Sequence, residues 1–354
     1  MSREEPAIGG TLPCYRALRA GETLHWCSCG RSATQPLCDG SHRGSAFLPL
    51  RHVATAESEV LLCTCKRTLT PPFCDGAHNN IPGAKPLDDP ESVANRAIPL
   101  VAQGADGRAW LDGGCFVCRV EALPRERLGE LAIAVLIDAT TGAQHQSQFL
   151  LELAGGRESP VLGFGERETA LLIAGGSGEL TISGERFVLH ADTGACIRPG
   201  EAFRLRAEAG SPLRAFASVG PLATGPEILP AMPGGFEAGW PRRCVPVDTA
   251  ARQTMGDRFF QMLVDRDAGS QMLTQFIGEI PLSKAMPHRH LYEESLVVLR
   301  GSGCLWTETR KAEVRAGDVI FLPRRQLHSL QCTDPAGMFV AGVIYPGDNP
   351  AINY

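Results

Sequence analysis

The chain has 354 residues, of which 44% are hydrophobic and 21% charged, so its length predicts two or three globular domains. Its formal net charge of −5, without a basic run, argues against nucleic acid as a partner. No apolar run approaches the roughly 20 residues that span a bilayer, which argues against a membrane protein. The start, MSREEPAIGG, has no signal-peptide pattern, so we expect a cytoplasmic protein whose thirteen cysteines are reduced.

The residue composition changes twice along the chain. Residues 1–82 contain two cysteine motifs and few long apolar stretches, so we expect bound metal to help this segment fold. Residues 83–96 are rich in proline and charge and indicate a linker with one short helical turn. From residue 97 onward, short β-type runs alternate with glycine and proline turns, which is typical of a sandwich or barrel.

The β region looks duplicated. Each half has a glutamate, an apolar run and a glycine turn, and we match Glu168 with Glu294 and Gly175 with Gly301. Proline and glycine concentrate near ATGPEILPAMPGGFEAGWP, which suggests where the halves divide. We therefore predict two β-barrels, over residues 97–228 and 229–354.

The two cysteine motifs, CSCGRSATQPLCDGSH and CTCKRTLTPPFCDGAH, share one spacing. Cysteines two apart in an extended segment point to one side, whereas a cysteine and a histidine four apart face the same way on a helical turn. Three cysteines and one histidine suit structural zinc as well as an iron–sulfur cluster, so the spacing alone leaves both open. The predicted ligands are Cys27, Cys29, Cys38 and His42 in the first motif, and Cys63, Cys65, Cys74 and His78 in the second.

Both motifs resemble the CDGSH iron–sulfur family, the mitoNEET-like proteins, at every position of the pattern CxCxx(S/T)xxxPxCDG(S/A/T)H. The matches include Ser32 and Pro36, then Thr68 and Pro72, and the resemblance covers about the first 80 residues. It implies one [2Fe-2S] cluster per motif, and the tandem arrangement resembles the monomeric subclass of the family. A neutral histidine ligand should make each cluster easier to reduce than an all-cysteine cluster.

A second group of ligand-type residues lies near the end of the sequence, in PHRHLYEESLVVLRG and GDVIFLPRRQLH. In a strand His288 and His290 share a face, Glu294 follows at the next strand's start, and His328 lies beyond a proline turn. Three imidazoles and one carboxylate leave two positions open on an octahedral ion such as Fe(II) or Mn(II). We predict that these four residues bind a mononuclear divalent metal and form the catalytic site.

These segments resemble the cupin superfamily, whose motifs are Gx5HxHx3–4Ex6G and Gx5PxGxxHx3N. The four predicted ligands fall on the motif, and so do Gly301, Gly317 and Pro323. Three positions depart from it: Leu282, Arg325 and Cys332 replace a glycine, a glycine and an asparagine. The resemblance implies a jelly-roll barrel, called a double-stranded β-helix, and a bound ion. We expect Fe(II), with Mn, Zn or Ni as alternatives.

The first half has Leu162 and Phe164 where His288 and His290 align, so we predict a metal-free structural barrel. We interpret His145 and His190 as histidines without a metal role. Arg324, Arg325 and Cys332 are candidate substrate contacts at the barrel mouth, although a solvated turn and core packing are the competing interpretations. Cys115 and Cys118 form a CxxC that we interpret as two packed thiols rather than a redox pair.

Three functions follow as hypotheses. The first is an oxidoreductase, a non-haem Fe(II) oxygenase or dioxygenase that acts on a small polar organic molecule while the clusters supply or store electrons. The second is a non-oxidative isomerase, decarboxylase or hydrolase with structural or regulatory clusters. The third is a redox or iron sensor without catalysis. A small-molecule substrate is the expected partner, with a redox protein as a second, and the sequence leaves the oligomeric state open.

Overall fold

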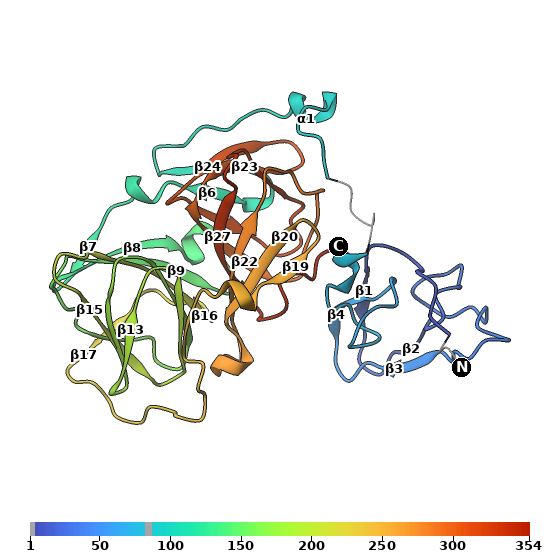
Figure 1. The fold of residues 1–354 in the computed structure, drawn as a ribbon, viewed down its shortest axis with the longest axis horizontal. Helices are drawn as coiled ribbons and strands as arrows, with labels where there is room; N and C mark the ends of the chain where they lie inside the picture. Colours follow the sequence, from blue (N-terminus) through green and yellow to red (C-terminus); the bar gives the residue numbers. More distant parts are fainter. Residues whose placement is uncertain (1–3, 82–86) are drawn as a thin grey trace.

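The computed structural model describes residues 4–81 and 87–354, which are organised almost entirely as strands. Figure 1 shows a small N-terminal module in blue, a green and yellow barrel, and an orange and red barrel. This confirms the predicted fold class of two jelly-roll barrels preceded by a small module. Within the described ranges, no helix is long and apolar enough to cross a bilayer.

The N-terminal module consists of two strand pairs, β1 with β4 and β2 with β3, both antiparallel. Its small core contains Leu18, Trp26 and Leu62 together with Cys63 and Cys65, so the second cysteine motif is part of what the module packs around. The elements are β1 (Cys14–Leu18), β2 (Thr23–Trp26), β3 (Leu50–Val53), β4 (Ser58–Leu62) and the 3₁₀ turn η1 (Ala77–Asn80).

The predicted linker, residues 83–96, is described from residue 87 onward, and its residues 83–86 lie outside the described residues. Ser92 caps the one short helix, α1 (Val93–Ala97), because its side chain accepts a hydrogen bond from the Asn95 N–H. Asp88 forms an ion pair with the buried Lys284, which fixes this segment to the second barrel.

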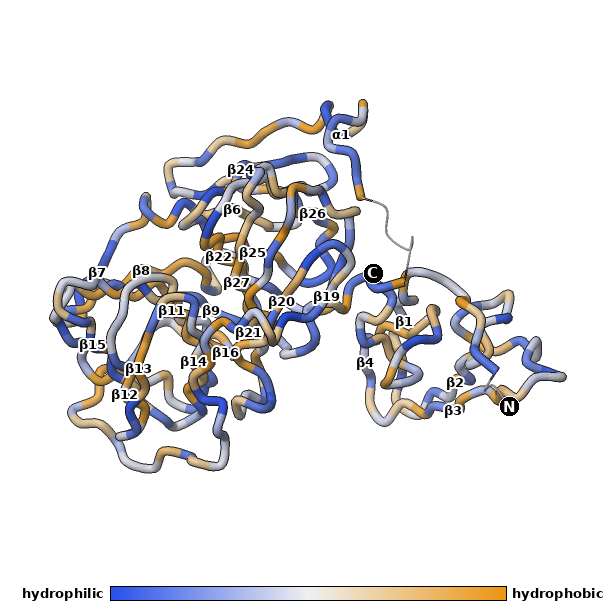
Figure 2. Tube along the Cα trace, viewed as in Figure 1, coloured by the Kyte–Doolittle hydropathy of each residue, from blue (hydrophilic) through white to orange (hydrophobic). Residues whose placement is uncertain are grey.

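The first barrel packs a seven-stranded sheet against a five-stranded sheet. The order in the larger sheet is β18-β14-β11-β16-β9-β8-β7 and in the smaller sheet β13-β12-β15-β10-β17. Figure 2 shows hydrophobic residues along these strands, and their inward side chains form one apolar cluster. The strands are β7 (Glu126–Leu128), β8 (Leu131–Ile137), β9 (Ser147–Leu153), β10 (Val161–Gly163), β11 (Glu168–Gly175), β12 (Gly178–Ile182), β13 (Glu185–Leu189), β14 (Thr193–Ile197), β15 (Ala202–Ala207), β16 (Leu213–Gly220), β17 (Glu227–Leu229) and β18 (Cys244–Pro246).

The second barrel packs an eight-stranded sheet, β19-β20-β21-β27-β22-β25-β6-β5, against the three-stranded sheet β24-β23-β26. Its strands are β5 (Arg108–Trp110), β6 (Phe116–Cys118), β19 (Gln253–Met255), β20 (Arg258–Val264), β21 (Thr274–Ile280), β22 (Glu293–Arg300), β23 (Ser302–Trp306), β24 (Lys311–Arg315), β25 (Val319–Leu322), β26 (Ser329–Cys332) and β27 (Met338–Tyr345). Short 3₁₀ turns join the strands of both barrels: η2 (Asp112–Gly114), η3 (Val120–Ala122), η4 (Ala139–Thr141), η5 (Thr249–Ala251) and η6 (Arg266–Ala268).

The two barrels exchange strands across the boundary predicted at residues 228 and 229. β6 precedes the first barrel in the chain but pairs with β25 of the second, and β18 follows the first barrel's last hairpin but pairs with its β14. A third apolar cluster, which includes Phe116, Phe216 and Phe321, fills the space between the barrels. The barrels are therefore one interlocked body, and a division by residue number does not separate their sheets.

The register corrects the predicted alignment of the two halves. Glu168 begins β11 and Glu293 begins β22, and each carboxylate accepts backbone N–H groups from a loop of the other barrel. Glu293 binds the N–H groups of Gln144, His145 and Gln146 at 3.0–3.2 Å. Glu168 therefore corresponds to Glu293 and not to Glu294. The matching of Gly175 with Gly301 is wrong by the same single residue.

Glu293→Ala should destabilise the protein strongly. Glu293 is 2% exposed, and its removal leaves three N–H groups of the other barrel without an acceptor, at a cost of about 2–4 kcal/mol. The melting temperature, followed by circular dichroism, should fall by roughly 5–10 °C. Glu313→Ala, at an exposed position of β24, is the matched control and should leave it unchanged. Equal melting temperatures for both variants would show that the carboxylate does not lock the barrels.

Candidate functional site

The four predicted metal ligands lie at one end of the second barrel. His288 and His290 are in the extended segment before β22, and Glu294 is the second residue of that strand. His328 directly precedes β26 and pairs with His288 through two backbone hydrogen bonds of 3.0 and 3.1 Å. His288 and His328 are 40 residues apart in the sequence, but this pairing brings them into contact. Their ring centroids are 4.5 Å apart.

One nitrogen of each histidine ring is held by a backbone carbonyl. The Nδ1 atoms of His288, His290 and His328 lie 2.9, 2.7 and 3.0 Å from the carbonyl oxygens of Met286, Tyr292 and Gln326. Because a carbonyl only accepts, each Nδ1 carries the proton and each Nε2 keeps a lone pair. This is the tautomer that a metal-binding imidazole requires.

Ligand atoms of three of the four residues converge, and His288 lies outside this group. Atoms from His290, Glu294 and His328 all lie within 4.8 Å of one another, and His290 Nε2 is 3.0 Å from Glu294 Oε2. Although it is buried, His290 Nε2 makes no hydrogen bond within the described part of the chain. Burial, with repulsion from the neighbouring histidines, lowers the pKa of His328 well below its usual value and keeps the ring neutral. An orphaned imidazole nitrogen beside a carboxylate fits a divalent metal ion.

The ligands open into a cavity of about 80 Å³ with mostly apolar walls. Phe276, Leu296 and Val340 are among its lining residues, and Tyr292 stacks on His290 with the ring centroids 4.1 Å apart. Burial raises the pKa of Tyr292 well above its usual value, and its hydroxyl donates to the Pro350 carbonyl. The walls around the buried His290, Glu294 and His328 are therefore largely apolar, and the Tyr292 hydroxyl is not free to act as an acid or base.

Arg258 is the one lysine or arginine among the described residues that line this cavity, and it was not among the predicted site residues. Its side chain is 11% exposed, and Nη2 donates to the Leu330 carbonyl at 2.8 Å. Although burial lowers its pKa, a guanidinium stays charged at neutral pH. A signal was present: Arg258 is in phase with Phe260 on the inward face of β20, where a charged side chain is unusual.

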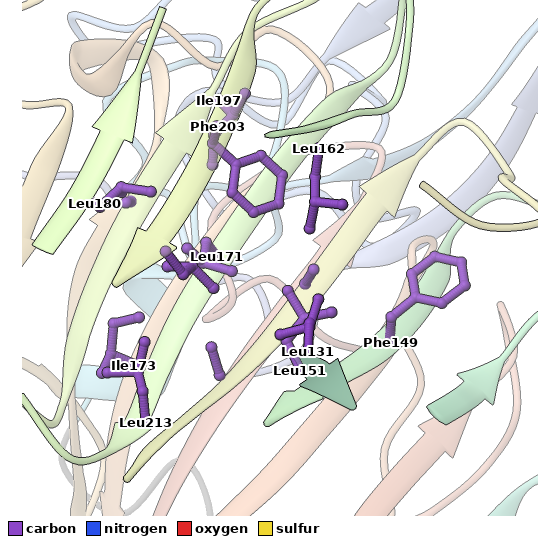
Figure 3. Close-up of a cluster of buried hydrophobic side chains, with 14 of the residues drawn as sticks. Leu131, Phe149, Leu151, Leu162, Leu171, Ile173, Leu180, Ile197, Phe203 and Leu213 are labelled. Carbon is purple, nitrogen blue, oxygen red and sulfur yellow. The ribbon is translucent and has the colours of Figure 1, made fainter. Parts of the chain in front are cut away.

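The first barrel fills the equivalent positions with apolar side chains. Leu162 pairs with Phe203 as His288 pairs with His328, and Thr169 takes the place of Glu294. Figure 3 shows Leu162 and Phe203 in this barrel's packed interior, and the Phe164 ring stacks on Phe203 at 6.5 Å. Hydrophobic packing therefore occupies the space that the second barrel leaves for its ligands.

The three candidate substrate contacts lie elsewhere than predicted. Arg324 and Arg325 form ion pairs of 3.3 and 2.8 Å with Glu59 of the N-terminal module, so they join the modules instead of lining the cavity. Arg325 occupies the motif's glycine position with φ of 65°, and its counterpart Gly200 has φ of 77°. Cys332 is 1% exposed and belongs to the barrel core, as the competing interpretation holds.

Each cysteine motif brings its predicted ligands together in two pairs. The Sγ atoms of Cys27 and Cys29 are 3.6 Å apart, and Cys38 Sγ is 3.2 Å from His42 Nδ1. The second motif repeats these distances at 3.5 and 3.3 Å. Backbone N–H groups of Gly40 and Gly76 donate to the sulfurs of Cys38 and Cys74 at 3.4 Å, which stabilises thiolates. This donor set fits an iron–sulfur cluster, in which two ligands hold each iron.

The two motifs differ in what surrounds them. His42 is half-buried, whereas His78 is 1% exposed. Asn79 donates to the Ala351 carbonyl at 2.6 Å, and Cys74 packs in one apolar cluster with Ile352. Figure 1 shows the C-terminus beside β1 and β4 of the N-terminal module. The second motif is thus buried against the segment 349–354, whereas the histidine of the first reaches the surface.

All thirteen cysteines lie within the described residues, and none of them forms a disulfide bond there. Cys115 points into the second barrel's core and Cys118 into the cluster between the barrels, so they face opposite sides of β6. Burial raises the pKa of Cys118 to about 11 and that of Cys115 further. This confirms the interpretation of two packed, unreactive thiols.

Comparison with known proteins finds similarity in the cupin-like barrel and in the part that resembles the CDGSH family. Residues 280–342 match the family model described as Cupin domain. The N-terminal part is similar to CDGSH iron-sulfur domain-containing protein 3, mitochondrial, with 50% identity over 38 residues to the Mus musculus protein and 60% over 30 residues to the Homo sapiens protein. These matches cover 11% and 8% of this chain, and 28% and 24% of the curated relatives, so they concern a short segment only.

Solved structures share the fold of the two barrels. Protein Ylba from E. coli, of family-model DUF861, has a TM-score of 0.53 at 15% identity, covering 69% of this chain and 96% of that chain. Oxalate decarboxylase from Bacillus subtilis has a TM-score of 0.51 at 10% identity, covering 66% and 76%. Oxalate decarboxylase from Lactobacillus farciminis has 0.52 at 12%, covering 66% and 86%. Residues 280–342 therefore match the cupin domain model, and the two barrels have the jelly-roll fold that these solved structures share.

Proposed function

We propose that this protein is a metal-dependent cupin enzyme that acts on a small organic acid by non-oxidative chemistry. The observation that carries the proposal is the buried Arg258 beside the three histidines and Glu294 in a largely apolar cavity. A guanidinium that is withdrawn from water next to open metal positions favours an anion between the two.

The ligand set defines what the metal would supply. His288, His290, Glu294 and His328 would hold a divalent ion, which polarises a bound carboxylate or carbonyl as a Lewis acid. Arg258 would fix a carboxylate in one orientation through its guanidinium. The apolar walls exclude water and so strengthen both interactions.

The cavity offers little protein acid–base chemistry. Apart from the ligands and Arg258, its described ionisable residues are Tyr292 and Glu279. The Tyr292 hydroxyl is bound to Pro350, and the Glu279 carboxylate pairs with Arg252 at 2.8 Å. This supports a reaction driven by metal polarisation, such as decarboxylation, in which carbon dioxide leaves and the product takes its proton from solvent, over one that needs a separate catalytic base. The likeness to oxalate decarboxylases agrees with this choice at the level of fold alone.

The test is anaerobic turnover. The 354-residue chain, loaded in turn with Mn(II), Fe(II) and Zn(II), would be incubated with panels of carboxylic and keto acids and followed by proton NMR. We expect one acid to be converted at the same rate with and without dioxygen. Conversion that stops when dioxygen is removed would contradict non-oxidative chemistry.

A second candidate function is an oxygenase that receives electrons from the second cluster site. One observation favours it: the segment 349–354 contacts Asn79 on one side, and on the other its Pro350 accepts from Tyr292, which stacks on His290. A redox group at Cys74 and His78 would lie close to the metal cavity. Oxygen-dependent turnover that Cys74→Ser abolishes and Cys38→Ser preserves would support this candidate over the first.

Replacing His290 with Ala should remove about one equivalent of metal per chain. His290 is 1% exposed, and its Nε2 lies 3.0 Å from Glu294 Oε2, so its loss opens the centre of the ligand set. Metal content measured by inductively coupled plasma mass spectrometry checks this, and activity on any acid found above should disappear. His190→Ala, at an exposed histidine of the first barrel, should retain the metal. Unchanged metal in His290→Ala would place the site elsewhere.

Each cysteine motif should hold its own cluster. Cys38→Ser and Cys74→Ser should each lower iron and acid-labile sulfide by about half, because each removes one of four ligands from a single site. Cys14→Ser changes a cysteine of the same module outside both motifs and should keep the full content. Visible absorption and iron analysis give the result. A colourless protein with stoichiometric zinc would contradict the cluster assignment.

A further inference from the structure

A second, larger space lies outside the metal cavity. It is an open chamber of about 660 Å³, within the size range of small-molecule sites. Met255, Arg258, His288 and Asn353 line both the chamber and the metal cavity, so the two spaces share a wall. A ligand whose end lies in the metal cavity would therefore be next to the chamber, at these four residues.

Both modules build this chamber. Leu12, Asn80 and Ile81 come from the N-terminal module, and Met286 and Pro287 from the segment that precedes the metal ligands. Asn80 fixes the two sides together, because its side chain donates to the Thr254 carbonyl at 3.2 Å and accepts from the Gly256 N–H at 3.3 Å. The chamber is thus a product of module docking, and neither part of the chain forms it alone.

The chamber walls combine apolar surface with one buried guanidinium. Leu12 and Met286 are 50% and 40% exposed and leave apolar surface open on the two sides. Arg258 lies where the chamber meets the metal cavity, and its Nη1 makes no hydrogen bond to any residue that the structure describes. Asp257 also lines the chamber, but its carboxylate accepts from Ser283 Oγ at 2.8 Å and stays 3.9 Å from Arg258 Nε. The guanidinium therefore keeps capacity for an external anion.

We propose that the chamber binds the apolar body of a monocarboxylic acid whose carboxylate is held by Arg258 at the metal cavity. This inference rests on the proposed function and names its substrate class. The metal cavity of about 80 Å³ accepts only the acid end, whereas the chamber has room for an aliphatic or aromatic body. Through Leu12 and Ile81, the N-terminal module would then contribute to substrate binding.

The experiment is calorimetric titration of acetate, butanoate, hexanoate and octanoate into the Mn(II)-loaded 354-residue chain. If the body enters the chamber, the affinity should rise about three- to fourfold for each added methylene, as expected for burial of apolar surface. 1-Octanol, which has the same body without the charge, should bind at least about tenfold more weakly than octanoate. Equal binding of 1-octanol and octanoate would overturn the role of Arg258.

Matched variants locate the body of the acid. Leu12→Glu places a like charge and a polar side chain on the chamber wall, so it should weaken octanoate about tenfold or more and leave acetate unchanged. Leu48→Glu, at a leucine of the same module that is 78% exposed and outside the chamber, should change neither. Arg258→Gln should weaken every acid by a similar factor, with folding checked by circular dichroism.

The results of these titrations distinguish failure of the chamber proposal from failure of the proposed function. Affinity that stays flat from acetate to octanoate, or octanoate binding that Leu12→Glu does not change, would overturn the chamber while leaving the acid site intact. Failure of all four acids, acetate included, to bind the metal-loaded chain would overturn the proposed function and the inference with it.

Discussion

The organisation of the histidine site and of the second cysteine motif depends on how one short segment, residues 349–354, is held. Its backbone exchanges two hydrogen bonds with Arg289, the residue between His288 and His290, at 2.8 and 2.9 Å. Its other side receives the side-chain amide of Asn79, just after the second cluster motif. Because the same few residues order the histidine pair and bury His78, a displacement of this segment would disturb both sites at once.

This contact makes the two cysteine motifs unequal although their sequences are nearly equivalent. Gly76 of the second motif has φ of 89°, and a side chain there would meet Ala351 within 2.7 Å, so its surface is shaped for docking. Gly40 of the first motif has a similar φ of 93°, but only the end of Arg43 lies nearby. The surface of the first motif is therefore left uncovered at this glycine, whereas the second motif is covered by the segment 349–354.

The sequence predicted those features that depend on local spacing. Ligand pairs in the cysteine motifs and the histidine pair follow from strand and turn periodicity, so they could be identified from the chain alone. Arg258, the strand exchange of β6 and β18, and the one-residue error at Glu168 could not, because each depends on which distant segments pair. Adjacent Glu293 and Glu294 illustrate this limit: alternation along β22 turns one toward the first barrel and the other toward the ligands.

The charges around the cupin site imply that metal and anion assist each other's binding. Glu294 is the one carboxylate among the predicted ligands, and Arg258 is buried close enough to lower the pKa of His328 further. A bound divalent ion and the guanidinium would together outweigh Glu294 and the nearby Asp257 by one positive charge in a largely apolar cavity, where water screens charge poorly. An incoming carboxylate relieves this excess, so it should bind more tightly when the metal is present. By reciprocity the same acid must raise the affinity for the metal by an equal factor. Under the proposed function, occupancy by the acid and by the metal would then be coupled through electrostatics.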